Sequence, residues 1–353
     1  MKTYLISGGC GFIGSHFIRY ILNETSDIHI LNIDALTYAG NPLNLIDVEQ
    51  HYSERYSFIK GDINDKIMIE KIFSERDIEC VVHFAAESHV DRSFDDPQLF
   101  MKTNVLGTST LLSAAMDSWQ QKIAGSQKFL HISTDEVYGS LSLDCKEKFT
   151  EKSPLQPRSP YAASKASADL LAQSYHICFK FPVIITRCSN NFGSYQYPEK
   201  LIPLMIFNMK NGLPLPIYGD GNQMRNWISI SDHCKALWAV LNKGQVGDIY
   251  NISGEYECSN LTLVNMLCEI VASKFGKNKD YFKKYITFIK DRPGHDLSYT
   301  MACSKVKNQT GWSPSNTFTQ DLTATVEWYL THERWIESCK KSLEIWLKSH
   351  YDL

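Results

Sequence analysis

The feature that most constrains the fold is a glycine-rich turn within the first fifteen residues. Residues 3–7 have the pattern of a buried strand, Gly8-Gly9-Cys10-Gly11-Phe12-Ile13-Gly14 follows, and residues 15–22 have helical spacing. Glycines here permit a tight turn and close approach of a diphosphate, whose charge the helix N-terminus then faces. A glycine pattern alone is weak evidence, but its place between a strand and a helix strengthens it. The sequence predicts a dinucleotide-binding loop that includes Gly8, Gly11 and Gly14.

A second predicted strand, residues 28–34, ends in Asp34, twenty residues after Gly14. A carboxylate at this spacing binds the ribose 2′-hydroxyl of a dinucleotide and repels a 2′-phosphate. The alternative is a simple loop acid, and the spacing favours the ribose contact. We therefore expect the cofactor to be NAD rather than NADP.

Strands and helices continue to alternate along the first half of the chain. Further strands are predicted at residues 57–63, 80–86, 128–134 and 183–187, with a helix over residues 97–115. This alternation predicts an α/β fold with a Rossmann-type, doubly wound parallel sheet. At the end of one strand the small pair Ala85-Ala86 would let a flat ligand lie close to the backbone, although ordinary helix-sheet packing explains such a pair equally.

The strand at residues 128–134 ends abruptly in the polar sequence Ser133-Thr134-Asp135-Glu136. The carboxyl end of a buried parallel strand is where open α/β sheets place their ligands. Two adjacent carboxylates can divide acid and base work if their surroundings separate their pKa values. The alternative is a strand-to-loop exit in which Asp135 caps a turn.

A second candidate catalytic pair is Tyr161 and Lys165, in the sequence Ser159-Pro160-Tyr161-Ala162-Ala163-Ser164-Lys165. Residues four apart share one face of a helix. A lysine close to a phenol stabilises the phenolate and lowers the pKa of the phenol. An accidental surface pair is the alternative, but the preceding dinucleotide loop and hydroxyl residues favour catalysis.

The alternation loosens after residue 187, which predicts a smaller mixed α/β lobe. We expect a polar turn at residues 190–193, a helix beginning within 197–203, and strand and turn pieces at 215–221 and 223–227. The predicted division is residues 1–190 for the NAD-binding domain, with some later segments returning to it, and 191–353 for the substrate lobe. This lobe carries cations suited to a nucleotide diphosphate, although each taken singly is compatible with a solvated surface charge: Lys200, Arg225, Arg292 and His295.

Composition excludes several other classes of protein. The chain has 353 residues, of which 43% are hydrophobic, so it can bury a large core. Its net charge of -3 argues against a nucleic-acid partner or a basic membrane surface. Ten scattered cysteines without a CxxC pair predict free thiols in a reducing cytosol and no metal. There is no predicted signal peptide, and no apolar run reaches the roughly 18 residues of a membrane span, so we expect a cytoplasmic protein without a membrane partner.

Several stretches together resemble a known family. The glycine loop and the Tyr161-x-x-x-Lys165 pair resemble the extended short-chain dehydrogenase/reductase superfamily. Four more stretches resemble the dTDP-glucose 4,6-dehydratases within it: residues 85–91, 133–139, 187–191 and 292–296. The resemblance runs from about Lys2 to Trp328. The Asp-Glu pair after Ser-Thr is its most specific part, because the sugar-nucleotide epimerases of the superfamily lack it.

The resemblance implies a role for each matching residue. The implied catalytic residues are Thr134, Asp135, Glu136, Tyr161 and Lys165. The implied NAD contacts are Gly8, Gly11, Phe12, Ile13, Gly14, Asp34, Asp62, Ile63, Ala85, Ala86, Thr103, Tyr161, Lys165 and Asn191. The implied contacts to the sugar nucleotide are Ser88, Thr134, Asn190, Lys200, Leu201, Pro216, Tyr218, Arg225, Asn260, Arg292 and His295.

The resemblance also implies a reaction, a lyase step of deoxysugar biosynthesis. It converts dTDP-glucose to dTDP-4-keto-6-deoxyglucose and water, with tightly bound NAD as internal hydride carrier. Tyr161 would take the proton of the carbon-4 hydroxyl, Glu136 would remove the hydrogen on carbon 5, and Asp135 would protonate the departing carbon-6 hydroxyl. A homodimer is implied as well, paired through helices near residues 97–115 and 161–179, with apolar faces from Leu99, Leu111, Leu112, Leu170 and Leu171.

The sequence departs from the family pattern in places, mostly on the nucleotide side. Ser194 stands where a proline is usual, Asn226 replaces an aspartate, and Leu297-Ser298 and Met301-Ala302 replace other pairs. The base and the sugar therefore stay open. The alternatives are a dehydratase or carbon-4 epimerase acting on another nucleotide sugar, such as UDP-glucose or a UDP-amino sugar, and a non-catalytic dinucleotide sensor on the same fold.

Overall fold

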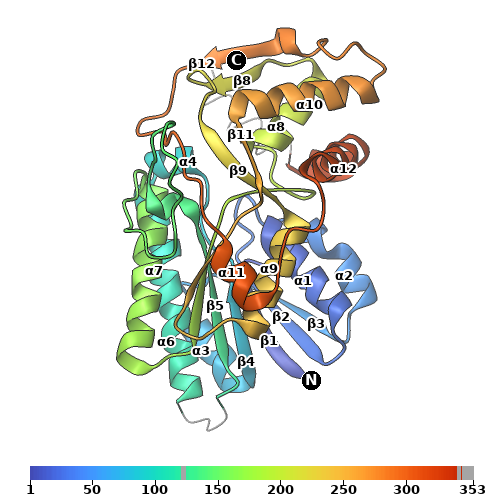
Figure 1. Ribbon diagram of the computed structural model, residues 1–353. Helices are drawn as coiled ribbons and strands as arrows, with labels where there is room; N and C mark the ends of the chain where they lie inside the picture. The colour runs from blue at the N-terminus through green and yellow to red at the C-terminus, as the bar shows by residue number, and fades with distance from the viewer. Residues whose placement is uncertain (121–124, 340–342, 344–353) are drawn as a thin grey trace.

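The centre of the molecule is a seven-stranded sheet in the order β10-β6-β5-β4-β1-β2-β3. The computed structural model describes residues 1–120, 125–339 and 343. Every neighbouring pair in this sheet is parallel. Figure 1 shows helices on both of its faces and a smaller lobe above its carboxyl edge. The predicted fold class, a doubly wound parallel sheet with a smaller mixed lobe, is confirmed.

The first part of the chain builds most of this sheet. Its elements are β1 Lys2–Ser7, α1 Phe12–Glu24, β2 Ile28–Asp34, α2 Ile46–His51, β3 Tyr56–Lys60, α3 Lys66–Glu75, β4 Ile78–His83, α4 Val90–Asp95, α5 Pro97–Met101, α6 Thr108–Trp119, β5 Lys128–Thr134, α7 Pro160–Phe179 and β6 Val183–Cys188. Short 3-10 turns span Pro42–Leu45 and Asp135–Tyr138, and a π-helical turn spans Lys102–Gly107.

The later part of the chain divides between the sheet and the smaller lobe. Its elements are β7 Asn190–Phe192, α8 Leu201–Asn211, β8 Leu215–Tyr218, β9 Met224–Ser229, α9 Ile230–Lys243, β10 Ile249–Ile252, β11 Tyr256–Ser259, α10 Asn260–Lys274, a 3-10 turn Lys283–Tyr285, β12 Ile286–Ile289, α11 Ser304–Thr310 and α12 Phe318–Thr331. Strand β10 pairs with β6, and α9 packs against α1. The division at residue 190 stays a prediction.

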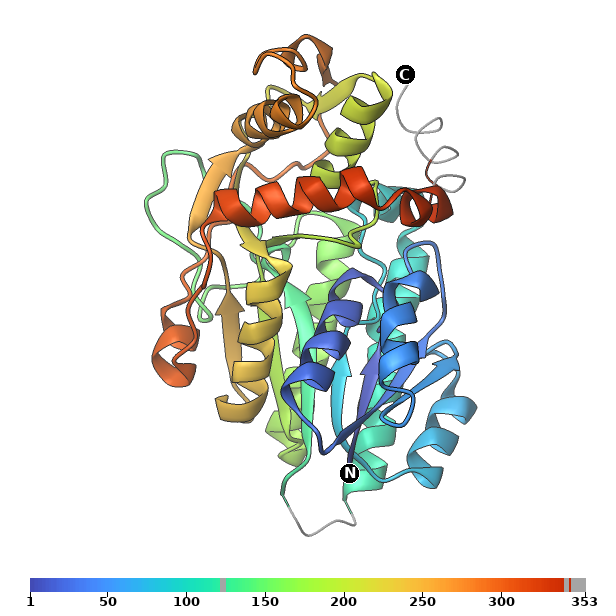
Figure 2. The same ribbon diagram turned by 90° about the vertical axis from the view of Figure 1, so that its right-hand side faces the viewer.

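Burial of both sheet faces explains why the strands are continuous apolar runs. Successive residues of β1 point to opposite faces, so Leu5 joins one apolar cluster and Ile6 another. Helices α3, α6 and α7 cover the face of Leu5, whereas α1, α9 and α11 cover that of Ile6. A third cluster fills the smaller lobe between α8, α10 and α12. Figure 2 shows α12 lying across the junction of the sheet and this lobe.

Several predicted element bounds were wrong. The strands β3 and β4 end at Lys60 and His83, earlier than predicted, because the chain turns over the sheet edge there. The predicted helix over residues 97–115 is interrupted by the π-helical turn, whose Gly107 packs against Ile63. The predicted polar turn at residues 190–193 begins instead with strand β7, because pairing with β9 overrides its local turn preference.

All ten cysteines are free thiols, as predicted. Within the described residues, no helix is both long enough and apolar enough to cross a membrane.

Two of the five leucines predicted for a dimer face belong to the core of the single chain. Leu111 and Leu112 are fully buried against the sheet, because α6 turns them inward. Leu171 is partly buried against the same cluster. Only Leu99 and Leu170 of the five are largely exposed, at 42% and 57%.

We expect Leu111→Ala to destabilise the chain by about 2–5 kcal/mol, because it removes a fully buried side chain from a packed cluster. Urea unfolding followed by circular dichroism would measure the loss. Ile67→Ala, on a side chain of α3 that is 80% exposed, is the matched control and should change the free energy of unfolding by less than about 0.5 kcal/mol per chain. Equal losses in the two variants would contradict this assignment of the core.

Candidate active site

The glycine loop lies at the point where the order of strands reverses. The chain runs from β1 to β2 and β3 on one side of the sheet, then from β4 to β5 and β6 on the other. Such a reversal leaves a crevice between the first strands of the two halves, here β1 and β4. Gly8 follows β1 with a positive φ of 74°, and a Cβ on it would lie 2.5 Å from the backbone nitrogen of Ala85, which follows β4. A Cβ on Gly14 would overlap the carbonyl oxygen of Gly8. Glycine is therefore needed at both positions.

A cavity opens above this loop and extends along the carboxyl edge of the sheet. Every residue predicted to contact NAD lines it: Gly8, Gly11, Phe12, Ile13, Gly14, Asp34, Asp62, Ile63, Ala85, Ala86, Thr103, Tyr161, Lys165 and Asn191. We call this space the dinucleotide cavity. Helix α1 begins at Phe12, so its N-terminus opens into the cavity.

Asp34 is held in a fixed orientation at the end of β2. Its Oδ2 accepts a hydrogen bond from the backbone nitrogen of Cys10 at 2.9 Å, and its Oδ1 accepts one from Leu36 at 2.8 Å. Burial raises the pKa of Asp34, and these two N–H donors oppose the rise. The carboxylate thus lies beside the glycine loop, where a ribose of a bound dinucleotide would meet it.

The acid pair occupies a 3-10 turn that begins as soon as β5 ends. The Thr134 hydroxyl donates to Oδ1 of Asp135 at 3.1 Å and accepts from the backbone nitrogen of Glu136 at 3.3 Å. Asp135 is 3% exposed, and its Oδ2 has no hydrogen-bond partner in the described part of the chain. The turn therefore directs two neighbouring carboxyl groups into the lining of the dinucleotide cavity.

The surroundings of the two carboxyl groups separate their pKa values. Burial, followed by the charge of Glu136, raises the pKa of Asp135 well above its ordinary value. Burial, followed by the charge of Asp296, raises the pKa of Glu136 to about 7. Asp135 therefore binds its proton more tightly than an ordinary aspartate and is suited to be a proton donor, while Glu136, with a pKa of about 7, is partly ionised near neutral pH and can accept a proton.

Tyr161 and Lys165 lie in the first turns of α7, whose N-cap Ser159 accepts a hydrogen bond from the nitrogen of Ala162 at 3.0 Å. Lys165 Nζ donates to the carbonyl oxygen of Ile132 at 2.7 Å, and burial lowers the pKa of Lys165 to about 8. The prediction that Lys165 lowers the pKa of Tyr161 is wrong for this arrangement. Burial and then the charge of Glu136 raise the pKa of Tyr161 well above 10.

A second cavity adjoins the first and is lined largely by the smaller lobe. The predicted substrate contacts that line it are Ser88, Asn190, Lys200, Leu201, Pro216, Tyr218, Arg225, Asn260, Arg292 and His295. We call it the nucleotide cavity. Thr134, the remaining predicted substrate contact, lines the dinucleotide cavity. The residues that line both cavities are Ser88, Glu136, Asn190, Asn191, Gln196, Glu199 and Lys200. Glu136 thus lies where the two cavities meet.

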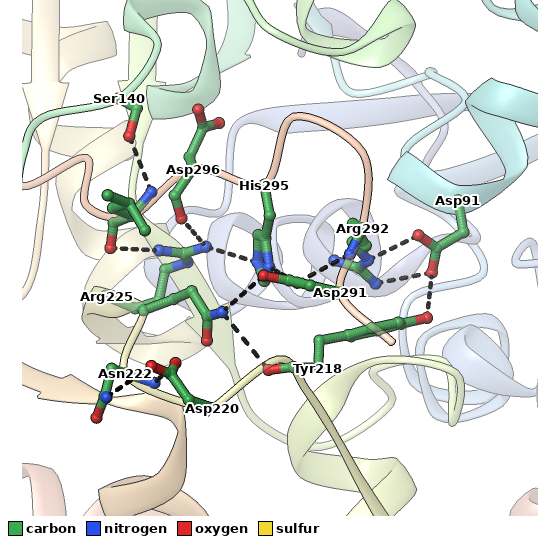
Figure 3. A network of polar contacts seen from close by, with 12 residues as sticks. Asp91, Ser140, Tyr218, Asp220, Asn222, Arg225, Asp291, Arg292, His295 and Asp296 are labelled. Carbon is green, nitrogen blue, oxygen red and sulfur yellow. Dashed lines mark hydrogen bonds and ion pairs between the residues drawn. The ribbon is translucent and has the colours of Figure 1, made fainter. Parts of the chain in front are cut away.

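Arg225 and Arg292 of the nucleotide cavity are held by a network of polar contacts (Figure 3). Arg225 Nη2 donates to the carbonyl oxygen of Asp296 at 2.9 Å and lies 3.1 Å from Nε2 of His295. The guanidinium also covers the ring of Tyr299, with 4.1 Å from Cζ to the ring centroid. Lys200 Nζ donates to the carbonyl oxygen of Ser88 at 2.9 Å. Arg225 is buried and held by neutral groups, so its charge is available to an anionic ligand.

The prediction of His295 as a cation is wrong. Burial, followed by the charge of Arg225, lowers the pKa of His295 to about 4. Its Nδ1 lies 2.6 Å from Oδ1 of Asp291, and its Nε2 faces Arg225. A neutral ring that donates from Nδ1 and accepts at Nε2 satisfies both contacts.

Sequence reasoning gave no role to several residues of this site. Asp296 and Tyr299 line the nucleotide cavity, and Glu199 lines both cavities while pairing with Arg92 at 3.0 Å. Asp91 holds Arg292 from behind the cavity. Asp91 and Asp296 belong to stretches that carried the family resemblance, which is the signal that would have pointed to them.

Two of the departures from the family pattern are next in sequence to residues that line the nucleotide cavity. Asn226 is 2% exposed in β9. Ser298 bridges by its backbone to Leu141 and to Met224. Ser194 lies further off, where its carbonyl oxygen is 2.9 Å from Nε2 of His16.

The glycine loop at the switch point and the Tyr161-x-x-x-Lys165 helix at the same cavity place the molecule in the extended short-chain dehydrogenase/reductase class. The family model described as GDP-mannose 4,6 dehydratase matches residues 5–325. The chain belongs to this group of nucleotide-sugar dehydratases and, within it, to the dTDP-glucose 4,6-dehydratase family.

The relatives that support this assignment cover nearly the whole chain. A dTDP-glucose 4,6-dehydratase of Haemophilus influenzae is 49% identical over 336 residues, which are 94% of this chain and 98% of the relative. The crystal structure of DesIV, a dTDP-glucose 4,6-dehydratase of Streptomyces venezuelae with NAD and TYD bound, is 42% identical with a TM-score of 0.87, covering 96% of this chain and 100% of DesIV. A UDP-glucuronic acid 4-epimerase of Bacillus cereus is only 29% identical, with a TM-score of 0.81, over 93% of this chain and 99% of the epimerase.

The raised pKa of Glu136 predicts a pH-dependent effect of Glu136→Gln on stability. The folded pKa of about 7 exceeds the ordinary 4.5, so the folded state binds more protons and stability is lost as pH rises from about 4.5 through 7. Glutamine cannot ionise, so the variant should gain on the wild type by about 3 kcal/mol between pH 4.5 and pH 8. Urea unfolding at several pH values measures this gain. Glu147→Gln, in an exposed loop, is the matched control, and a pH-independent difference for Glu136→Gln would contradict the prediction.

Proposed function

We propose that the chain converts dTDP-glucose to dTDP-4-keto-6-deoxyglucose and water, with NAD retained through each turnover. The observation that carries this proposal is the acid pair. Asp135, whose pKa is raised well above its ordinary value, and Glu136, whose pKa is raised to about 7, are adjacent, and Glu136 lies where the two cavities meet. Removal of water from a sugar requires such a donor and such an acceptor at one place. The dehydratase names of the relatives support the same reaction.

The residues of the dinucleotide cavity fit NAD. Glycine is required at two positions of the loop, which leaves the backbone open to a diphosphate, and the Asp34 carboxylate faces the place of a ribose hydroxyl. NAD supplies the site with a hydride acceptor that later returns the hydride to the sugar. Several structures of relatives have NAD bound, among them DesIV and a dTDP-glucose 4,6-dehydratase of Bacillus anthracis.

In each step of the proposed reaction, one side chain accepts or donates a proton. Tyr161 acts as the phenolate, which accepts the proton of the carbon-4 hydroxyl. Because burial raises the pKa of Tyr161, this form needs nearby positive charge, which Lys165, one turn further along α7, and the nicotinamide of bound NAD would supply. Oxidation at carbon 4 acidifies the hydrogen on carbon 5, which Glu136 removes. Asp135 donates its proton to the carbon-6 hydroxyl, so that water leaves. The hydride then returns to carbon 6, and Glu136 gives a proton back to carbon 5, which completes the product. Thr134 holds the acid pair in place through its two hydrogen bonds.

The nucleotide cavity is suited to the diphosphate and the base of the substrate. Lys200, Arg225 and Arg292 bring positive charge to one wall, and Leu204, Met205 and Trp227 contribute carbon surface. We propose dTDP rather than UDP as the nucleotide, as in the named relatives. A pocket distinguishes one methyl group by only about 1–3 kcal/mol.

The test of the proposed function is incubation of the purified protein with dTDP-glucose and, in parallel, with UDP-glucose. A 4-keto-6-deoxy product with a higher kcat/KM for dTDP-glucose supports the proposal. A changed configuration at carbon 4 would indicate an epimerase. Absence of turnover with any sugar nucleotide would indicate a dinucleotide sensor.

Glu136→Gln should separate oxidation from elimination. Glutamine keeps the shape of the side chain but cannot accept the carbon-5 proton, so product formation should fall by about 10²–10⁴-fold or more. Tyr161 is untouched, so the absorbance of reduced nicotinamide should appear when the variant is mixed with dTDP-glucose. Tyr161→Phe is the matched comparison and should show neither signal nor product. Wild-type product rates in Glu136→Gln, or no reduced nicotinamide despite demonstrated binding, would exclude Glu136 as the carbon-5 base.

We also infer that the protein is a cytoplasmic homodimer. Apolar side chains are exposed along α5, the adjoining π-helical turn and α7, where Leu99, Met101 and Leu106 line a shallow groove. Leu170, Ile177 and Phe179 of α7 are 57%, 68% and 58% exposed. A second copy related by a two-fold axis would cover these helices and form a bundle of four.

Light scattering should therefore show the mass of two chains at micromolar concentration. Leu106→Glu should shift the protein toward one chain, because it places a charge in the apolar groove. Leu213→Glu, at an exposed leucine of the smaller lobe, is the matched control and should leave the mass unchanged. A wild type with the mass of a single chain would overturn the dimer.

A further inference from the structure

Asp91 contacts two residues that line the nucleotide cavity, Tyr218 and Arg292. It lies in α4, just after the Ala-Ala-Glu-Ser-His stretch, and none of the functions described above uses it. Its Oδ1 lies 2.7 Å from Nε of Arg292, and its Oδ2 accepts a hydrogen bond from Nη2 of Arg292 at 2.8 Å. The Tyr218 hydroxyl donates to the same Oδ2 at 3.0 Å. Figure 3 shows Asp91, Arg292 and Tyr218 meeting at one end of the network.

These contacts join two parts of the molecule. Asp91 follows β4 of the large sheet, whereas Tyr218 ends β8 and Arg292 comes three residues after β12. Strands β8 and β12 pair with each other, and Ile289 lies opposite Tyr218. Asp91 therefore fixes the end of this two-stranded sheet to the edge of the large one. The contact is largely shielded from water, since the side chains of Asp91 and Arg292 are 11% and 24% exposed.

Asp91 and Tyr218 hold the guanidinium of Arg292 in one orientation. Nη2 of Arg292 donates to Asp91, Nε lies 2.7 Å from the same carboxylate, and Cζ lies 4.3 Å from the centroid of the Tyr218 ring. The planar group is thus held at one edge and on one face. Arg292 lines the nucleotide cavity together with Lys200 and Arg225. Among the described residues, Asp91 is not part of the lining of either cavity, so it acts through Arg292.

We propose that Asp91 is a positioning residue for nucleotide binding: it holds Arg292 so that the guanidinium meets a phosphate of the nucleoside diphosphate. This inference rests on the proposed function, because it takes the occupant of the cavity to be a nucleoside diphosphate. A long arginine side chain loses rotational freedom when it binds a phosphate. Asp91 removes that freedom beforehand, so the loss does not weaken binding.

The test compares phosphate-dependent and phosphate-independent binding. Calorimetry would measure the affinity for dTDP, and NMR titration the affinity for thymidine, in the wild type and in Asp91→Asn. We expect the variant to bind dTDP about tenfold more weakly and thymidine within about twofold of the wild type. The KM for dTDP-glucose should rise by a similar factor, with kcat within about threefold.

The matched control is Asp47→Asn. Asp47 receives Nε and Nη2 of Arg19, both at 2.7 Å, in the same two-point geometry, and neither residue is among those described as lining the two cavities. This variant should bind dTDP like the wild type. If Asp91→Asn does not fold, Tyr218→Phe removes only the hydroxyl that donates to Asp91. It should weaken dTDP binding by about two- to fivefold, with thymidine unchanged.

Four results would overturn the proposal. Unchanged dTDP affinity in Asp91→Asn, or in Tyr218→Phe where that variant is needed, would show that Arg292 needs no holding. Tighter binding would show that Asp91 competes with the phosphate. Equal losses for dTDP and thymidine would indicate a purely structural contact. A wild type that does not bind dTDP would refute the proposed function and this inference with it. If the wild type binds dTDP, the affinity of Asp91→Asn tests the role of Asp91 alone.

Discussion

The candidate active site depends on one buried ion pair, Arg187 with Asp169. Arg187 of β6 and Asp169 of α7 are 1% and 0% exposed, and Nε lies 2.8 Å from Oδ2. The other carboxylate oxygen is 3.3 Å from Nε2 of His131 in β5. Arg187 Nη1 also donates to the Tyr138 hydroxyl at 2.9 Å, at the last residue of the turn that carries the acid pair. One guanidinium thus connects the helix of Tyr161 to the turn of Glu136, and removal of one partner from such a pair typically destabilises a protein by about 3–5 kcal/mol.

The same pair explains why the pKa values of two buried aspartates at the carboxyl edge shift in opposite directions. Burial alone would raise the pKa of Asp169, but the neighbouring His131 ring and the charge of Arg187, which donates to Asp169, outweigh burial and lower it. Asp135 is as deeply buried, but its largest electrostatic neighbour is Glu136, and its pKa rises. The charge of Asp169 is therefore balanced by its neighbours, whereas Asp135, beside Glu136, binds its proton more tightly than an ordinary aspartate. Of the two, Asp135 is the one suited to be a proton donor.

Much of the fold and of the candidate site could be predicted from patterns within a few neighbouring residues. Strand β2 has the predicted bounds, because a continuous apolar run between turns has few other conformations in an α/β chain. Strand β7 could not be predicted, because its three residues become a strand only through β9, which lies more than thirty residues later. Leu111 illustrates the same limit, since a leucine on a helix does not reveal whether the core or a second chain covers it. His295 was taken for a cation because its neighbour Arg225 is seventy residues away in sequence. The roles given to the individual site residues remain predictions.

The position of the site follows from the order of the strands rather than from any one motif. The carboxyl ends of β4, β5 and β6 are neighbours in the sheet, so the residues that follow them converge although they lie near positions 88, 135 and 190 of the sequence. The glycine loop joins them only because β1 pairs with β4 at the reversal of the strand order. The smaller lobe then covers this edge, and its arginines face the acid pair across the junction of the two cavities. A ligand that bridges the cavities must therefore carry a group for the acid pair at one end and negative charge at the other, which is the chemistry of a nucleotide sugar.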